Sequence, residues 1–254
     1  MHYSAVAILL LAFVLQAGAP AGELTARQQA AAFDHFRAGM QALASEQFDR
    51  AETEFRAAIK IDPLYDAAFY GLGQLYMAKR QYQEALRAYL DSRNAFKASA
   101  EARATNKVTT DRRIRDQIQA LNEYVRSLER AGSRGNPNLV ADLQRQRVRI
   151  RQLEAQLTLA AGSLPEVPAG LSMAIGSAFF RLGEFAEAER EYLEAVRVDP
   201  GFGEAHNNLA VVYMLTGRLD QAEKSIAQAE KSGFKVSDAL KADLKKRKGG
   251  TPAA

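Results

Sequence analysis

The sequence predicts an all-α protein: a solenoid of paired helices, interrupted by a long antiparallel helical hairpin. Three observations predict this fold. No proline occurs between Pro63 and Pro137, and the stretch is rich in Ala, Gln, Arg, Leu and Glu, which favour helices. A set of small and aromatic residues recurs at a fixed interval on both sides of the middle of the chain. Within the middle, apolar residues recur in heptads.

The N-terminal segment is expected to be a signal peptide. Residues 5–15 form an apolar run, and Ala19-Pro20-Ala21 fits the small-x-small cleavage rule, so residues 1–21 would be removed. The run is shorter than the roughly 20 apolar residues that span a bilayer. The first four residues carry no Lys or Arg, which argues against a signal, and an uncleaved membrane anchor or an unexported apolar helix are the alternatives. The expected location is the periplasm or the cell exterior.

The repeats become visible when the chain is aligned on two Asp-Pro pairs, which end at Pro63 and Pro200. In both halves the same residue types stand 24, 15, 12, 8 and 5 residues before the proline. In order these are Gly39, Phe48, Ala51, Phe55 and Ala58, and Gly176, Phe185, Ala188, Tyr192 and Ala195. Five matched positions indicate repeated helix pairs in which the small residues allow close approach and the aromatic residues fill the adjacent space.

Two further units follow at a spacing of 34 residues. Their matching positions are Gly73, Tyr76, Tyr82, Ala85 and Tyr89, and Ala210, Tyr213, Leu219, Ala222 and Ile226. This pattern resembles the tetratricopeptide-repeat (TPR) family. The resemblance implies about four helix-turn-helix repeats, with an N-terminal pair in residues 22–99 and a C-terminal pair in residues 169–236. Lys97 and Phe234 replace the expected prolines. Lys97 predicts that the second helix of the second unit continues into the insert.

The chain after the repeats, residues 237–254, is expected to form a capping helix and a basic tail. Ser237 can cap a helix over residues 238–247. Leu240 and Leu244 would face the last repeat, and the lysines would face water. Such an end helix is what the family resemblance implies.

The insert, residues 100–168, has nearly the length of two repeats, so degenerate repeats are one interpretation. Its period favours another, because its apolar residues alternate in spacings of four and three, with Gln146 as the polar member of one seam. These seams are Ile114, Ile118, Leu121, Val125 and Leu128, and Leu139, Leu143, Gln146, Ile150, Leu153, Leu157 and Ala160. Turn residues separate them at 131–138, which predicts a coiled-coil hairpin followed by a linker.

The sequence offers no catalytic, metal or cofactor site, and we expect neither enzymatic activity nor a cofactor. The chain has no Cys and three His. His35 and His206 occupy the same repeat position, which favours packing roles over metal ligation. Gly71-Leu72-Gly73 lacks the third glycine and the preceding strand of a phosphate-binding loop.

The family resemblance implies that partner proteins bind along the inner surface of the first helix of each repeat. The partner would be a peptide or a helix, held in a groove rich in aromatic and methionine side chains. The carboxylate clamp of some family members is absent, because Met173 and Ser177 occupy its positions. The expected groove residues are Phe36, Arg37, Met40, Tyr70, Gln74, Met77, Phe180, Arg181, Asn207, Asn208, Val211 and Met214.

The charge distribution supports an alternative function as a tether to an anionic surface or envelope polymer. Residues 99–161 carry 12 basic and 7 acidic side chains, and residues 235–254 carry 6 and 2. The basic clusters are Arg112, Arg113 and Arg115, then Arg145, Arg147, Arg149 and Arg151, and in the tail Lys241, Lys245, Lys246, Arg247 and Lys248. Because export is expected and no aromatic residues interleave these charges, nucleic acid is not an expected partner. Self-association through the hairpin stays open.

Overall fold

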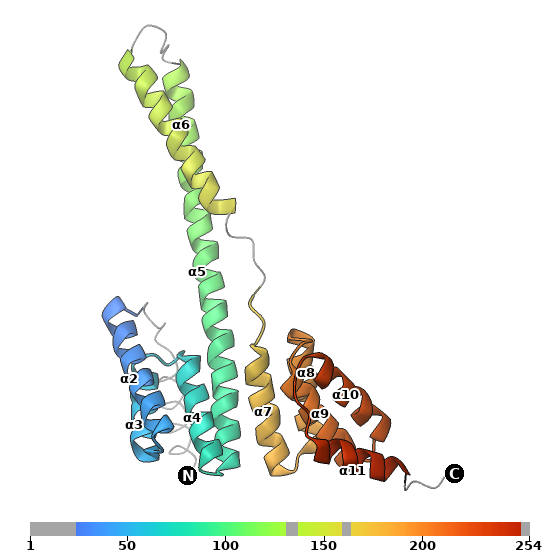
Figure 1. The fold of residues 1–254 in the computed structure, drawn as a ribbon. Coiled ribbons are helices and arrows are strands. Elements are labelled where there is room, and N and C mark those ends of the chain that lie inside the picture. The colour runs from blue at the N-terminus through green and yellow to red at the C-terminus, as the bar shows by residue number, and fades with distance from the viewer. Residues whose placement is uncertain (1–23, 131–136, 159–163, 250–254) are drawn as a thin grey trace, which may run out of the picture. The chain divides into compact units, whose positions relative to one another are not determined.

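The computed structural model describes residues 24–130, 137–158 and 164–249. The signal-peptide prediction lies outside these residues. The described chain is helical and contains no strand, and its helices run from α2 to α11 (Figure 1). It divides into two units. One unit combines residues 24–96 with residues 168–249, and the other consists of residues 97–167.

The first unit contains the four predicted helix pairs. They are α2 (Ala26–Ala44) with α3 (Phe48–Ile61), α4 (Asp66–Ala78) with the start of α5 (Tyr82–Arg130), α7 (Ala169–Leu182) with α8 (Phe185–Val198), and α9 (Gly203–Leu215) with α10 (Leu219–Lys231). The helix α11 (Asp238–Gly249) follows the fourth pair and packs on α10. The predicted all-α repeat fold is therefore confirmed, including the continuation of the second pair into the insert.

The helices of each pair are joined by a short turn with one residue in the left-handed region. That residue is Glu46 (φ 56°), Arg80 (φ 58°), Gly183 (φ 82°) or Gly217 (φ 76°), always at the same repeat position. Glycine adopts this conformation without steric penalty, whereas Glu and Arg are strained in it. The third and fourth repeats therefore have the better turn residue.

Close contact between glycine and an aromatic ring holds the helices of a repeat together. A Cβ atom on Gly39 would lie 2.7 Å from the ring of Phe55, and one on Gly176 would lie 2.8 Å from the ring of Tyr192. Gly73 approaches Tyr89 in the same way. Phe55, Tyr89 and Tyr192 are buried, so each ring occupies the space that a missing side chain leaves. The recurring small and aromatic residues of the sequence are the residues that make these contacts.

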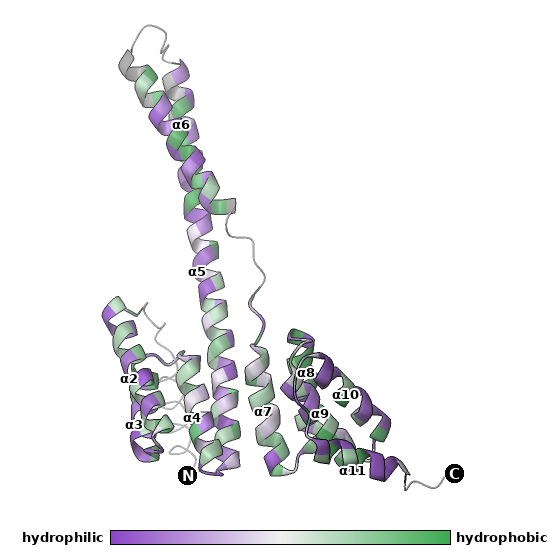
Figure 2. Cartoon of the chain, viewed as in Figure 1, coloured by the Kyte–Doolittle hydropathy of each residue, from purple (hydrophilic) through white to green (hydrophobic). Residues whose placement is uncertain are grey.

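The second unit is the hairpin, built from the later part of α5 and from α6 (Pro137–Thr158). Its core contains Val125, Leu143 and Ile150, with Ile118 and Leu121 packed against them. Arg147 of α6 pairs with Glu129 of α5 at 2.8 Å. Figure 2 shows hydrophobic positions interleaved with hydrophilic ones along both helices, as a two-helix seam requires.

Across the residues that the structure describes, no helix is both long enough and apolar enough to cross a lipid bilayer.

Candidate functional site

In the first repeat, the predicted groove residues lie on α2. Phe36 is half-buried, with its ring centroid 6.1 Å from Phe55 and 5.5 Å from Tyr65. Arg37 is exposed and pairs with Asp34 at 2.9 Å. Met40 is 37% exposed. Phe36 therefore contributes mainly to packing, whereas Arg37 and Met40 can meet a ligand directly.

In the second repeat, Tyr70, Gln74 and Met77 of α4 are all half-buried. The ring centroids of Tyr70 and Tyr89 are 5.4 Å apart. Burial raises the pKa of the Tyr70 hydroxyl and the nearby Glu204 carboxylate raises it further, while a hydrogen bond with Gln74 lowers it. Tyr70 therefore remains a neutral hydrogen-bonding group at physiological pH.

The third repeat contributes an aromatic ring and an arginine, and the fourth repeat adds side-chain amides. On α7, Phe180 packs on Phe185 with ring centroids 5.5 Å apart, and Arg181 is exposed. On α9, Asn207, Asn208 and Val211 are half-buried. The side-chain nitrogen of Asn207 lies 3.5 Å from the side-chain oxygen of Asn208. The C-terminal pair thus presents more amide groups than the N-terminal pair.

Asn208 also belongs to a polar chain that reaches into the third repeat. The Tyr192 hydroxyl donates to Ser177 Oγ at 3.3 Å, and Tyr192 also hydrogen-bonds with the Asn208 side chain. Burial raises the pKa of Tyr192. These contacts orient the Asn208 side chain.

Met214 requires a correction. It is only 2% exposed and lies in the core of the C-terminal pair. Its repeat equivalents Met77 and Phe180 are half-buried. The difference comes from α11, whose Leu244 joins the same core and whose Arg247 donates to the Met214 carbonyl at 3.3 Å. The Met214 side chain therefore does not belong to the exposed surface.

The exposed and half-buried predicted residues on α2, α4, α7 and α9 together form a surface that we call the helix-A surface. Its members are Phe36, Arg37, Met40, Tyr70, Gln74, Met77, Phe180, Arg181, Asn207, Asn208 and Val211. Phe33, which is 53% exposed, and Leu215, which is 50% exposed, lie on the same helices and add apolar area. Both residues could have been identified from the sequence, because each stands at an inward-facing position of its repeat.

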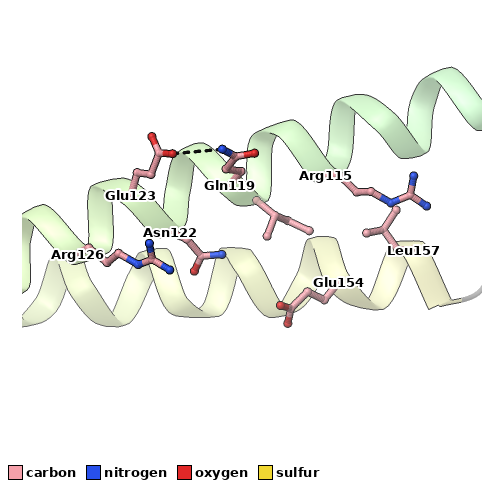
Figure 3. A pocket seen from close by; sticks show the side chains of 8 residues that line it. Arg115, Gln119, Asn122, Glu123, Arg126, Glu154 and Leu157 are labelled. Atoms are coloured by element: carbon pink, nitrogen blue, oxygen red, sulfur yellow. Dashed lines mark hydrogen bonds between the residues drawn. The ribbon is translucent and has the colours of Figure 1, made fainter.

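The hairpin has a hollow of its own between α5 and α6 (Figure 3). It is an open cavity of about 540 Å³. Ile118 and Leu157 supply its apolar lining, and Arg115, Arg126 and Glu154 supply charge. On its α5 side, Gln119 donates to Glu123 at 3.3 Å. Such a mixed, open hollow suits contact with another protein segment better than enclosure of a small molecule.

The basic residues of the hairpin and the tail differ in their surroundings. In the tail, Lys248 pairs with Asp220 at 2.8 Å and Glu223 at 2.6 Å, and Lys241 pairs with Glu230 at 3.1 Å. In the hairpin, Arg112, Arg113, Arg149 and Arg151 are exposed and form no ion pair among the described residues. The hairpin therefore holds more uncompensated positive charge than the tail helix.

The two histidines that the structure describes have local partners. His35 Nδ1 lies 2.7 Å from Glu54 Oε2, and His206 Nε2 lies 3.1 Å from the Pro200 carbonyl oxygen. Within the described part of the chain, no group of three or more His, Asp and Glu side chains is arranged to hold a metal ion.

Comparison with known proteins identifies the repeats. A family model described as tetratricopeptide repeat matches residues 36–103 and 173–234, just over half of the chain. No curated protein matches the sequence.

Among solved structures, the chain resembles PilW, a widely conserved type IV pilus biogenesis factor, with 16% identity, 87% coverage of each chain and a TM-score of 0.42. It also resembles TTC0263, a thermophilic TPR protein of Thermus thermophilus, with 21% identity, 85% and 98% coverage and a TM-score of 0.35. Pseudomonas aeruginosa PilF gives 13% identity, 86% and 85% coverage and a TM-score of 0.37. Likenesses at this level say nothing about function.

Proposed function

Because the chain belongs to the tetratricopeptide-repeat family, we propose that it is a non-catalytic scaffold that binds peptide or helical segments of partner proteins on the helix-A surface. The observation that carries this proposal is the composition of that surface. Aromatic and methionine side chains stand half-exposed on α4 and α7, and asparagine amides follow on α9. In general, apolar side chains supply binding energy, and amides satisfy the backbone of an extended segment.

The experiment is partner capture with surface variants. In the full chain, Tyr70→Glu combined with Met77→Glu places two charges at the centre of the helix-A surface. We expect loss of partners from a pull-down out of the native cells, read by mass spectrometry. Leu193→Glu is the matched control, because Leu193 is 44% exposed but lies on α8.

Circular dichroism separates lost binding from lost folding. If the double variant fails to fold, Met40→Glu tests the same surface at a position that is already 37% exposed. Folded variants that capture the same partners as the unmodified chain would refute the proposal. If Leu193→Glu causes an equal loss of partner capture, the binding surface would lie on the second helices of the repeats.

A second candidate function is attachment to an anionic surface or envelope polymer through the hairpin. The unpaired exposed arginines on α5 and α6 favour it, and the internal ion pairs of Lys241 and Lys248 argue against a role for the tail. Arg149→Gln with Arg151→Gln should weaken binding to phosphatidylglycerol vesicles. Lys245→Gln with Lys246→Gln removes the same charge from the tail and should not.

Salt distinguishes the two candidates. Attachment through exposed arginines should weaken steeply as ionic strength rises, because the interaction is screened over about 10 Å at 0.1 M salt. Capture on the helix-A surface, which is mainly apolar, should persist. Salt-independent vesicle binding, or binding unaffected by the arginine changes, would exclude the hairpin as the tether.

Export to the periplasm or the cell exterior is part of the proposal and rests on residues 1–21 alone. N-terminal sequencing of the protein from its native cells should give a start at Gly22. A product that retains residues 1–21 would favour the membrane-anchored or unexported alternatives.

A further inference from the structure

The helix α11 is attached to the C-terminal pair by few apolar contacts. Leu244, 6% exposed, is its only buried residue. Leu244 joins the core that contains Met214 and Ile226, and Leu240 packs at the edge of that core. A helix with one buried side chain is held far less firmly than α9, which buries seven residues.

Beyond these apolar contacts, Arg247 donates to the Met214 carbonyl at 3.3 Å, and the lysines of α11 form exposed ion pairs. Lys248 Nζ lies 2.8 Å from Asp220 and 2.6 Å from Glu223, whose side chains are 85% and 63% exposed. Lys241 Nζ lies 3.1 Å from Glu230, which is 45% exposed. Ion pairs in water contribute little to stability and are screened by salt. The carboxylates of α10 therefore favour a positively charged helix, but they hold α11 only weakly.

The junction between α10 and α11 borders an open hollow at the surface. This open cavity of about 560 Å³ is lined by Ile226, Leu244, Glu223 and the side chains of Lys241, Lys245 and Lys248. Ile226 and Leu244 are each only 6% exposed, so charged side chains make up most of the open part of this lining.

That surface has a definite chemistry. Its apolar part contains Met214 and Ile226, and its acidic part is the exposed face of α10 with Asp220, Glu223 and Glu230. Apolar residues beside a row of carboxylates complement an amphipathic helix that carries leucines four residues apart and lysines on the flanks. α11 has this pattern in Leu240, Leu244, Lys241 and Lys248.

We propose that α11 is a displaceable occupant of a docking site for a basic amphipathic helix of a partner protein. The partner helix would replace Leu244 over Met214 and Ile226 and would pair with the carboxylates of α10. Displacement of α11 returns Met214 to the surface, at the repeat position that Met77 and Phe180 occupy in the other repeats. While α11 is in place this site lies outside the helix-A surface, because Met214 is buried, and it does not depend on the proposal for that surface.

The experiment uses the full chain with Leu244→Asp, which releases α11 from the core, and a fluorescent peptide of residues 236–249 as the probe. Because the unmodified chain fills its own site, it should bind the peptide about tenfold or more weakly than the variant. A peptide with Leu240 and Leu244 both changed to Asp is the control and should bind neither chain. Lys248→Glu with Lys241→Glu places like charges beside the carboxylates of α10, which weakens the attachment of α11, and serves if Leu244→Asp disturbs the fold.

Three results decide the proposal. Tight binding of the peptide to both released variants, weakened at high salt, supports it. Equal binding to folded released and unmodified chains overturns it. A dimer of the unmodified chain in light scattering that Leu244→Asp abolishes also overturns it, because the occupant would then be α11 of a second copy.

Discussion

Arg93 in α5 and Glu191 in α8 form an ion pair at 2.8 Å that joins the second repeat to the third, although 98 residues separate them in the sequence. Their side chains are only 25% and 15% exposed. Among the described residues, the other carboxylate oxygen of Glu191 is buried and has no hydrogen-bond partner. The pair therefore couples the two repeat pairs, which the hairpin separates in the sequence.

Removal of one partner should be disproportionately destabilising. Arg93→Ala leaves the buried carboxylate of Glu191 without a counter-charge, and we expect a loss of about 2 kcal/mol in the free energy of unfolding. Arg197→Ala is the control, because Arg197 pairs with Glu194 within one exposed helix face, and there we expect about 0.5 kcal/mol or less. Urea unfolding monitored by circular dichroism measures both values.

The double change Arg93→Met with Glu191→Leu tests the explanation. Replacing both charges by apolar side chains of similar size should restore most of the stability lost in Arg93→Ala. If the double variant is as unstable as Arg93→Ala, the lost stability comes from the packing of the Arg93 side chain and not from the unpaired charge of Glu191.

Within each pair of repeats, a glutamate at the same repeat position links the first repeat to the second. Glu52 of α3 accepts from the Tyr76 hydroxyl at 2.9 Å and from Arg56, and Lys79 lies 3.8 Å away. Glu189 of α8 is its equivalent, with Tyr213 and Arg218 as partners. At the junction that carries the insert, Leu86 replaces this glutamate, and Arg93 with Glu191 provides the polar link instead.

The pKa of Glu52 predicts an acid-sensitive contribution. Burial raises this pKa, but the hydrogen bonds from Tyr76 and Arg56 outweigh burial and leave it below its usual value of 4.5. The folded state therefore gains stability from Glu52 above pH 4.5 and loses it as pH falls through the lowered pKa. Glu52→Gln should destabilise the protein at pH 7 and lose less stability between about pH 5 and pH 3 than the unmodified chain.

Thermal unfolding across that pH range measures the difference. Asp49→Asn is the control, since Asp49 is exposed on the same helix. Parallel pH profiles for Glu52→Gln and the unmodified chain would show that Glu52 does not contribute in its charged form.

The turn conformations predict stabilising substitutions in the first two repeats. Glu46 and Arg80 have φ values of 56° and 58°, whereas their equivalents Gly183 and Gly217 relieve this strain. Glu46→Gly or Arg80→Gly should raise the free energy of unfolding by about 0.5 kcal/mol, because the relief of left-handed strain exceeds the added entropy of the unfolded chain. Gly183→Ala should lower it by about 1 kcal/mol. Destabilisation by both glycine substitutions would contradict this argument.

The recurring residues made the repeat cores predictable, whereas contacts between distant segments were not. The interval between Gly39 and Phe55 is fixed by the geometry of one helix pair, so the sequence pattern carries it directly. Burial of Met214 depends on where α11 packs, and the pairing of Arg93 with Glu191 depends on how α5 and α8 meet after the insert. Neither contact has a local signal in the sequence.

The hairpin shows the same limit. Its heptad period predicted the seam of Val125 with Leu143 and Ile150. The hollow beside Ile118 depends on side-chain packing that the period does not specify. The helix-A surface was predictable as a set of positions, since each residue occupies a known place in its repeat, but its exposed area had to come from the structure.

The part of α5 between the repeats and the hairpin core predicts a local weak point. Residues 105–110 include three threonines, an asparagine and a valine, all poor helix formers. Val108 is 65% exposed. The Thr109 hydroxyl donates to the carbonyls of Asn106 at 2.8 Å and Thr105 at 3.3 Å, a contact that competes with the helical hydrogen bond. Low propensity, exposure and this competition act on the same two turns.

Amide hydrogen exchange should therefore be at least about tenfold faster at residues 105–110 than at residues 118–125, where α6 covers the helix. Replacing Thr105, Thr109 and Thr110 by alanine should slow exchange in that segment, because each change gains up to about 0.7 kcal/mol of helix propensity. Thr53→Ala is the control: its hydroxyl also bonds back, to the Asp49 carbonyl at 2.8 Å, but α3 is held by its neighbours and should exchange as before. Equal exchange in the two segments of α5 would mean that tertiary contacts protect residues 105–110, and the threonines would then have no effect on opening.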